Sequence, residues 1–241
     1  VAMNHPIKLL ANALGPPPAD VIERAHAAGV QVAALVGRAD QAQKQQAAGV
    51  DIIVAAGTEA GGHTGEVSTM VLVPEVVDAV APLPVLAAGG IGSGRQMAAA
   101  MALGAQGVWM GSIWLTTRES DTEPIVTDRL LAATSNDTVR SRSITGKPAR
   151  MLRTRWTEEW EGPESPGTLP MPLQLLATAD ATQRAHRAAL AGNAAAAELN
   201  VTIAGQIVGS MNQVRPAKKV VSDVIDELFD TVERMARLIE E

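Results

Sequence analysis

The stretch Asp51–Trp114 reads DIIVAAGTEAGGHTGEVSTMVLVPEVVDAVAPLPVLAAGGIGSGRQMAAAMALGAQGVWMGSIW, and it decides the fold. It contains three short apolar runs that end in or before glycine or a small residue: Asp51–Ala56, Val85–Ala88 and Gly107–Met110. Helix-forming segments separate these runs. Strand–helix alternation of this kind predicts a parallel sheet with crossover helices.

Two earlier apolar runs, Ile7–Ala13 and Gln31–Val36, extend the pattern to five predicted strands. In parallel α/β folds the chemistry lies at the carboxyl ends of the strands. Those ends carry Gly57–His63, then Gly89-Gly90, then Gly111-Ser112. Glycine lets the backbone approach a ligand, and two neighbouring ends that expose backbone N–H groups form a cup for an anion, most often phosphate.

The motifs EAGGHTGE (Glu59–Glu66) and AAGGIGSGR (Ala87–Arg95), followed by Gly111-Ser112, resemble the nitronate monooxygenase family. The same pattern belongs to its sister group, the FMN-dependent enoyl-acyl-carrier-protein reductases. The resemblance implies an α/β fold of the TIM (β/α)8-barrel type, with FMN across the top of the barrel. The five predicted strands correspond to strands four to eight, so we expect a fragment that lacks the first three βα units.

The resemblance also implies residue roles. His63 is expected to lie beside the flavin and to act on the substrate, because imidazole exchanges a proton near neutral pH. On its own, a histidine in a glycine-rich loop would read as a surface residue. Arg95 would either assist the phosphate site or pair locally. The expected cofactor-binding residues are Gly61, Gly62, Ala88, Gly89, Gly90, Gly111, Ser112 and Gln206.

The predicted organisation has two parts. Residues 1–122 read as the C-terminal part of an FMN-binding barrel, and residues 123–241 as a mostly helical substrate or lid region that returns to the barrel. Ser68 and Thr69 are expected to cap a helix that begins near Val73. The other expected helices are Ala19–Ala28, Asp40–Ala48, Glu123–Ala133, Leu173–Leu190 and Val220–Glu241.

Two segments between these helices lack a helical pattern. Val139–Arg155 is basic and reads as strand or loop, and Gly162–Pro172 reads as an extended loop that would line a pocket for a larger substrate such as an acyl-CoA.

Composition excludes several classes. The 241 residues carry a net charge of −6 and only 2% aromatic residues, which argues against nucleic-acid binding. There is no cysteine, so there is no disulfide, no thiolate nucleophile and no cysteine zinc site, and we expect no metal. No apolar run approaches the roughly 20 residues that span a bilayer. We therefore expect a cytoplasmic protein with a small-molecule substrate. Whether it forms a homo-oligomer is left open.

Three functions stay open. The first is FMN-dependent, nitronate monooxygenase-type oxidation of a small organic substrate with O2. The second is an FMN reductase of enoyl or acyl thioesters that uses NADH or NADPH. The third is a non-enzyme binding or assembly subunit with a degraded flavin site. Leu35 and Ala56 bear on the choice, because the monooxygenase branch often has lysine and aspartate at those strand ends. The substrate itself cannot be read from the sequence.

Overall fold

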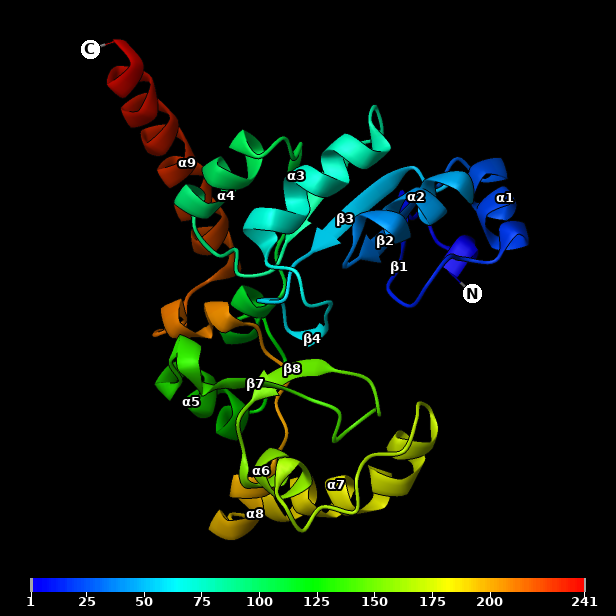
Figure 1. Ribbon diagram of the computed structural model, residues 1–241. Helices are drawn as coiled ribbons and strands as arrows, with labels where there is room; N and C mark the ends of the chain where they lie inside the picture. Colours follow the sequence, from blue (N-terminus) through cyan, green and yellow to red (C-terminus); the bar gives the residue numbers. More distant parts are fainter. Residues whose placement is uncertain (1, 241) are drawn as a thin grey trace. The chain divides into compact units, whose positions relative to one another are not determined.

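The computed structural model describes residues 2–240, which form two compact units (Figure 1). Unit 1 comprises residues 2–58, 65–110 and 222–240. Unit 2 comprises residues 59–64 and 111–221. Each unit is therefore built from segments that are not continuous in the sequence.

A five-stranded parallel sheet forms the centre of unit 1, in the order β1-β2-β3-β5-β6. Each strand pairs with the next strand of the same sheet along the chain, which is the arrangement that successive βα units produce. All five strands expected from the sequence are present. Their bounds are β1 (Leu9–Asn12), β2 (Gln31–Val36), β3 (Ile52–Ala56), β5 (Val85–Ala88) and β6 (Gly107–Trp109).

Helices connect these strands and bury one face of the sheet. One hydrophobic core cluster joins helix residues such as Ile22 and Val76 to strand residues such as Val32 and Ile53. The helices of unit 1 are η1 (Ala2–Asn4), α1 (Ala19–Ala27), α2 (Ala39–Ala47), α3 (Thr69–Val80), α4 (Gly94–Ala102) and most of α9 (Ala217–Glu240).

One sequence expectation for unit 1 is wrong. Helix α3 begins at Thr69, four residues before the expected start near Val73, and the Ser68 side chain makes no capping hydrogen bond. The Thr69 hydroxyl instead donates to the backbone carbonyls at the end of β5. The expected local cap is therefore replaced by a contact between α3 and a neighbouring strand end.

Unit 2 contains a small antiparallel sheet of β4 (Gly62–His63), β8 (Ala149–Leu152) and β7 (Thr138–Ser141), in that order. Strand β4 is only two residues long, and the basic segment supplies its partners. The helices of this unit are η2 (Ser112–Thr116), α5 (Pro124–Ala132), η3 (Ser135–Asp137), α6 (Arg155–Glu161), α7 (Leu173–Leu190), α8 (Ala194–Leu199) and η4 (Gln206–Ser210).

The helices predicted for residues 123–133 and 173–190 correspond to α5 and α7. No sequence pattern predicted α6 or α8. Within residues 2–240, no helix combines the length and apolar character that crossing a membrane requires.

Candidate functional site

The loop that precedes β4 is held by a close approach of two backbones in unit 2. A Cβ atom on Gly61 would lie 2.7 Å from the backbone nitrogen of Gly205, and one on Gly205 would lie 2.6 Å from the carbonyl oxygen of Glu59. The backbone N–H of Gln206 donates to the same Glu59 carbonyl at 2.9 Å. Only glycine fits at both positions, so the glycines of the motif fix the path of the loop before any ligand is considered.

His63 follows that loop and is anchored by its ring. Its Nε2 atom lies 2.9 Å from the Oγ1 atom of Thr145. Partial burial of the ring lowers the pKa of His63, and the positive charge of Lys147 lowers it further. The ring is therefore neutral at neutral pH and presents one nitrogen lone pair, which can accept a proton or a hydrogen bond.

Two arginines lie on the strands beside His63. Arg140 and Arg150 are directly opposite each other on β7 and β8, and Arg150 also faces Gly62 of β4. Arg140 Nε donates to Thr64 Oγ1 at 3.1 Å, and Arg150 donates to Thr138 Oγ1 at 2.9 Å. Burial lowers the pKa of Arg150, and the charge of Arg140 lowers it further, while Glu59 opposes both effects.

Like charges placed opposite each other across a sheet repel, and the carboxylate of Glu59 offsets part of the charge of this pair. Sequence reasoning noted the basic segment but did not connect it with His63. That connection depends on the pairing of β4 with β8.

Ser112 and Gln206 also lie in unit 2, as parts of η2 and η4. The backbone N–H of Gly205 donates to Ser112 Oγ at 2.8 Å, so the Ser112 hydroxyl keeps its own proton for another acceptor. Gly111 precedes η2, and a Cβ atom there would have open space around it. Ser112 and Gly61 therefore contact the same residue, Gly205. Their roles toward a cofactor stay predictions.

In unit 1, the β5 end has the backbone geometry expected of an anion cradle. Gly89 and Gly90 have φ values of +99° and +70°, a conformation that side-chain-bearing residues rarely adopt. Ala88 ends β5 and pairs with Trp109 of β6, so the ends of these two strands are neighbours. Successive backbone N–H groups in such conformations form concave anion sites.

Arg95 is engaged elsewhere. Its Nε atom lies 2.7 Å from Oε1 of Glu227 on α9, and Oε2 of Glu227 accepts from the backbone N–H of Gly94 at 2.7 Å. Neither option left open from the sequence describes this pair, because the partner of Arg95 comes from the other end of the chain rather than from the local turn.

Leu35 and Ala56 belong to a small apolar cluster on the second face of the five-stranded sheet. Ala33, Val54, Ala56 and Ala88 are buried in it, and Leu35 packs against them. Side chains alternate between the two faces of a strand, so the residues of this cluster point away from the helices that cover the first face. Apolar packing, rather than a charged side chain, therefore occupies these two strand ends.

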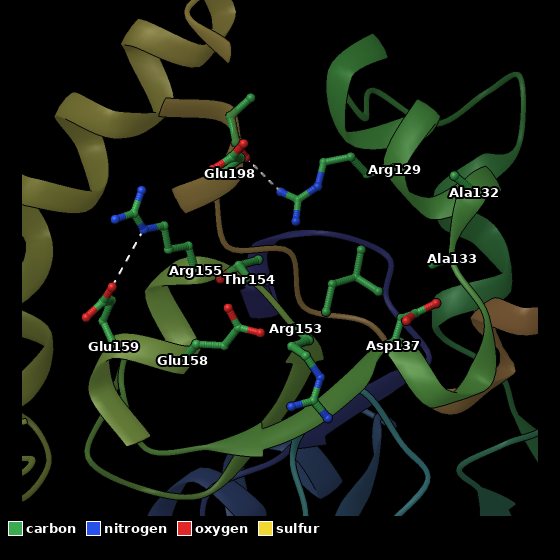
Figure 2. Close-up of a pocket in the computed structure, with 12 residues that line it drawn as sticks. Arg129, Ala132, Ala133, Asp137, Arg153, Thr154, Arg155, Glu158, Glu159 and Glu198 are labelled. Carbon is green, nitrogen blue, oxygen red and sulfur yellow. Dashed lines mark hydrogen bonds and ion pairs between the residues drawn. The ribbon is translucent and has the colours of Figure 1, made fainter. Parts of the chain in front are cut away.

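A cavity of about 730 Å³ lies in unit 2 (Figure 2). Its lining carries Arg129, Arg153 and Arg155, opposed by four carboxylates. Arg129 donates to the carbonyl oxygens of Ala197 and Asn200, and Arg155 Nε lies 3.6 Å from Glu159. The described lining includes neither the expected flavin residues nor the 162–172 loop. The cavity is therefore lined by charges of both signs, and it is distinct from the flavin site predicted from the sequence.

Comparison with known proteins places this arrangement in a family. Residues 1–227 match the family model described as nitronate monooxygenase. The chain belongs to the nitronate monooxygenase family. The resemblance of the EAGGHTGE and AAGGIGSGR motifs is thereby confirmed.

Two proteins with similar sequences illustrate what the chain resembles. The Mycobacterium tuberculosis protein named "Putative monooxygenase Rv1533" is 61% identical over 240 residues, which is 100% of this chain and 64% of that protein. A Rhodococcus jostii protein named (3aS,4S,5R,7aS)-5-hydroxy-7a-methyl-1-oxo-octahydro-1H-indene-4-carboxyl-CoA dehydrogenase is 45% identical over 138 residues, covering 57% of this chain and 39% of that protein. The chain thus spans less than two thirds of the length of these relatives.

The solved structure of FabK from Thermotoga maritima, a TIM barrel, superimposes with a TM-score of 0.81. It is 34% identical in sequence, and the match covers 95% of this chain and 70% of FabK. The expected fold class, an α/β fold of the TIM-barrel type, is confirmed, with five parallel strands in the described residues.

Proposed function

We propose that this protein is an FMN-dependent oxidoreductase that oxidises a small organic anion of the nitronate type with O2. The observation that carries the proposal is the placement of His63, whose Nε2 atom lies 2.9 Å from Thr145 Oγ1 and whose pKa is lowered by burial and by Lys147. A neutral imidazole can take the carbon-bound proton of a neutral nitro compound, which leaves the nitronate anion that is then oxidised. The neighbouring Arg140 and Arg150 give a positive potential that attracts an anion.

The chain's residues fit the expected cofactor in each unit. In unit 1, the backbone N–H groups of Gly89 and Gly90 would hold the phosphate. In unit 2, Ser112 keeps a hydroxyl proton to donate, and Gly61, Gly62 and Gln206 belong to the loop system that carries His63. When bound, FMN would supply the redox chemistry, while the protein supplies binding and orientation. The roles of Ala88 and Gly111 rest on the family resemblance.

A second candidate is the oxidation or reduction of an acyl-CoA thioester, with NADH or NADPH as the electron donor in the reductive direction. Two observations favour it. The relative from Rhodococcus jostii is named for a carboxyl-CoA substrate. Leu35 and Ala56 also lack the polar groups expected of the monooxygenase branch, and they pack in an apolar cluster. A proton donor in this reaction would have to be an imidazolium, which the lowered pKa of His63 disfavours.

The test is to identify the cofactor and then to follow two half-reactions. We expect FMN, not FAD, to be released on heating the purified protein. Addition of a nitronate should then bleach the flavin absorbance without O2 and give O2 uptake in air, whereas NADH should bleach it slowly. Rapid bleaching by NADH, without O2 uptake on addition of a nitronate, would favour the acyl-CoA candidate. A protein without any flavin would contradict both.

His63→Ala separates a catalytic role from a loop role. Loss of a general acid or base costs roughly 100- to 10,000-fold in rate, so flavin reduction by a neutral nitroalkane should slow by about that factor, whereas reduction by a preformed nitronate should slow less. His5→Ala is the matched control, because His5 is an exposed residue near the start of the chain. Equal rates in both variants would show that His63 is not catalytic.

A further inference from the structure

The Thr69 side chain contacts two consecutive carbonyls at the end of β5. Its Oγ1 atom lies 3.0 Å from the carbonyl oxygen of Gly89 and 3.3 Å from that of Ala88. The Ala88 carbonyl also accepts from the backbone N–H of Gly57 at 3.0 Å. Thr69 is half-buried and is the first residue of α3, so the start of that helix is tied to the strand end.

These contacts set the direction of two N–H groups. In a trans peptide the carbonyl and the N–H of the same peptide unit point in opposite directions. The Ala88 carbonyl shares its peptide with the Gly89 N–H, and the Gly89 carbonyl shares its peptide with the Gly90 N–H. Because both carbonyls point toward Thr69, both N–H groups point away from it, on the same side of the loop.

Other N–H groups further along the loop already have partners in the chain. The N–H of Gly92 donates to Gln96 Oε1 at 2.9 Å, and the N–H of Gly94 donates to Glu227 at 2.7 Å. The N–H groups of Gly92, Gly94 and Gln96 are thus occupied by side-chain oxygens. The N–H groups of Gly89 and Gly90, which precede them, are the ones whose direction Thr69 sets.

We propose that Thr69 is a positioning residue for the phosphate group of the flavin, because its hydroxyl holds the Gly89 and Gly90 peptides with their N–H groups aligned for one anion. The inference rests on the proposed function in that the anion is the FMN phosphate. In this role Thr69 acts on the Gly89 and Gly90 peptides rather than on the phosphate itself. Its effect is confined to ligands that carry a phosphate.

The experiment compares FMN with riboflavin, which lacks the phosphate. Flavin-free protein is titrated with each ligand, and the dissociation constants are measured from the quenching of flavin fluorescence. Loss of one hydrogen bond is worth up to about tenfold in an equilibrium constant. Thr69→Val should therefore weaken FMN binding by about tenfold and leave riboflavin binding unchanged, whereas Thr69→Ser should bind both like the wild type.

Ser68→Ala is the matched control, because the neighbouring Ser68 hydroxyl makes no capping hydrogen bond. It should leave the ratio of the two dissociation constants unchanged. Equal weakening of FMN and riboflavin in Thr69→Val would reduce Thr69 to a structural residue and overturn the proposal. An unchanged FMN affinity would also overturn it.

If the wild type binds no flavin, the proposed function fails but the role of Thr69 is still open to test. A second measurement therefore uses inorganic phosphate. Inorganic phosphate is titrated into the ¹⁵N-labelled protein, and the amide signals of Gly89 and Gly90 are followed. We expect both signals to shift in the wild type and in Thr69→Ser, and to shift much less in Thr69→Val. Equal shifts in all three proteins, or no shift in the wild type, would overturn the positioning role.

Discussion

The ring nitrogen Nε2 of His63 lies 2.9 Å from Oγ1 of Thr145, although 82 positions separate the two residues in the sequence. Thr145 is itself held by Lys147, since its Oγ1 atom lies 3.2 Å from the Lys147 carbonyl and 3.3 Å from the Lys147 backbone nitrogen. One short segment therefore orients the ring and also brings a positive charge near it. The position and the protonation of His63 are set together.

The first prediction concerns that charge. Burial is the larger cause of the lowered pKa of His63, and Lys147 is the second. Lys147→Gln removes the second cause, so the pKa of His63 should rise but stay below about 6.5, the value of an unperturbed histidine. The His63 ring signals in an NMR pH titration measure this shift. Lys44→Gln is the control, because Lys44 pairs with Asp40 in unit 1. An unchanged pKa in Lys147→Gln would contradict the assigned cause.

A second prediction concerns stability. Folding lowers the pKa of His63, so the unfolded chain takes up this proton at a higher pH than the folded chain does. The contribution of neutral His63 to stability is therefore complete above about pH 6.5 and is lost as the pH falls through the folded pKa. His63→Gln should lose less unfolding free energy across this window than the wild type does. Urea unfolding at several pH values measures the difference, and a variant whose curve parallels that of the wild type would refute the prediction.

The third prediction uses two glycines of the expected cofactor set. Gly61→Ala would place a Cβ atom 2.7 Å from the backbone nitrogen of Gly205, so one of the two segments must move. We expect a loss of about 1–3 kcal/mol in unfolding free energy, as for other overpacked sites. Gly111→Ala is the matched control, because a Cβ atom there meets nothing within 4 Å and the φ value of Gly111 is −118°. Equal losses in the two variants would contradict the close-approach explanation.

The sequence was informative where the signal was local. The five parallel strands were predicted because each is a short apolar run bounded by glycine or polar residues, and α7 was predicted because its residues keep a helical spacing. The family was recognisable because the chain contains the two glycine-rich motifs EAGGHTGE and AAGGIGSGR.

Other features depend on contacts between distant residues. Strand β4 contains only Gly62 and His63, which is too short to show any alternation, and its pairing with Ala149 and Arg150 is what brings the basic segment beside the histidine. Thr69 was expected to cap its own helix, but the acceptors of its hydroxyl belong to the end of another strand. No local pattern specifies which strand end a side chain will reach.

The partner of Arg95 also could not be predicted from local sequence. The sequence left its role open between the phosphate and a local partner, and the structure pairs it with Glu227, which follows Gly94 by 133 positions. One carboxylate thus binds both the Arg95 side chain and the Gly94 backbone. Negative charge at the amino end of a helix stabilises it, because the first N–H groups have no partner within the helix.

The last prediction tests this contact. Glu227→Ala removes both interactions and should lower the unfolding free energy by about 1 kcal/mol, the usual cost of losing a helix cap. Glu227→Gln keeps an oxygen acceptor for the Gly94 N–H but loses the ion pair, so its loss should be smaller, since exposed ion pairs contribute at most about 1 kcal/mol. Glu233→Ala is the control, because Glu233 pairs with Arg237 within α9 alone. Chemical unfolding of the three variants measures the differences. If Glu227→Ala were no more costly than Glu233→Ala, the carboxylate would not stabilise the amino end of α4.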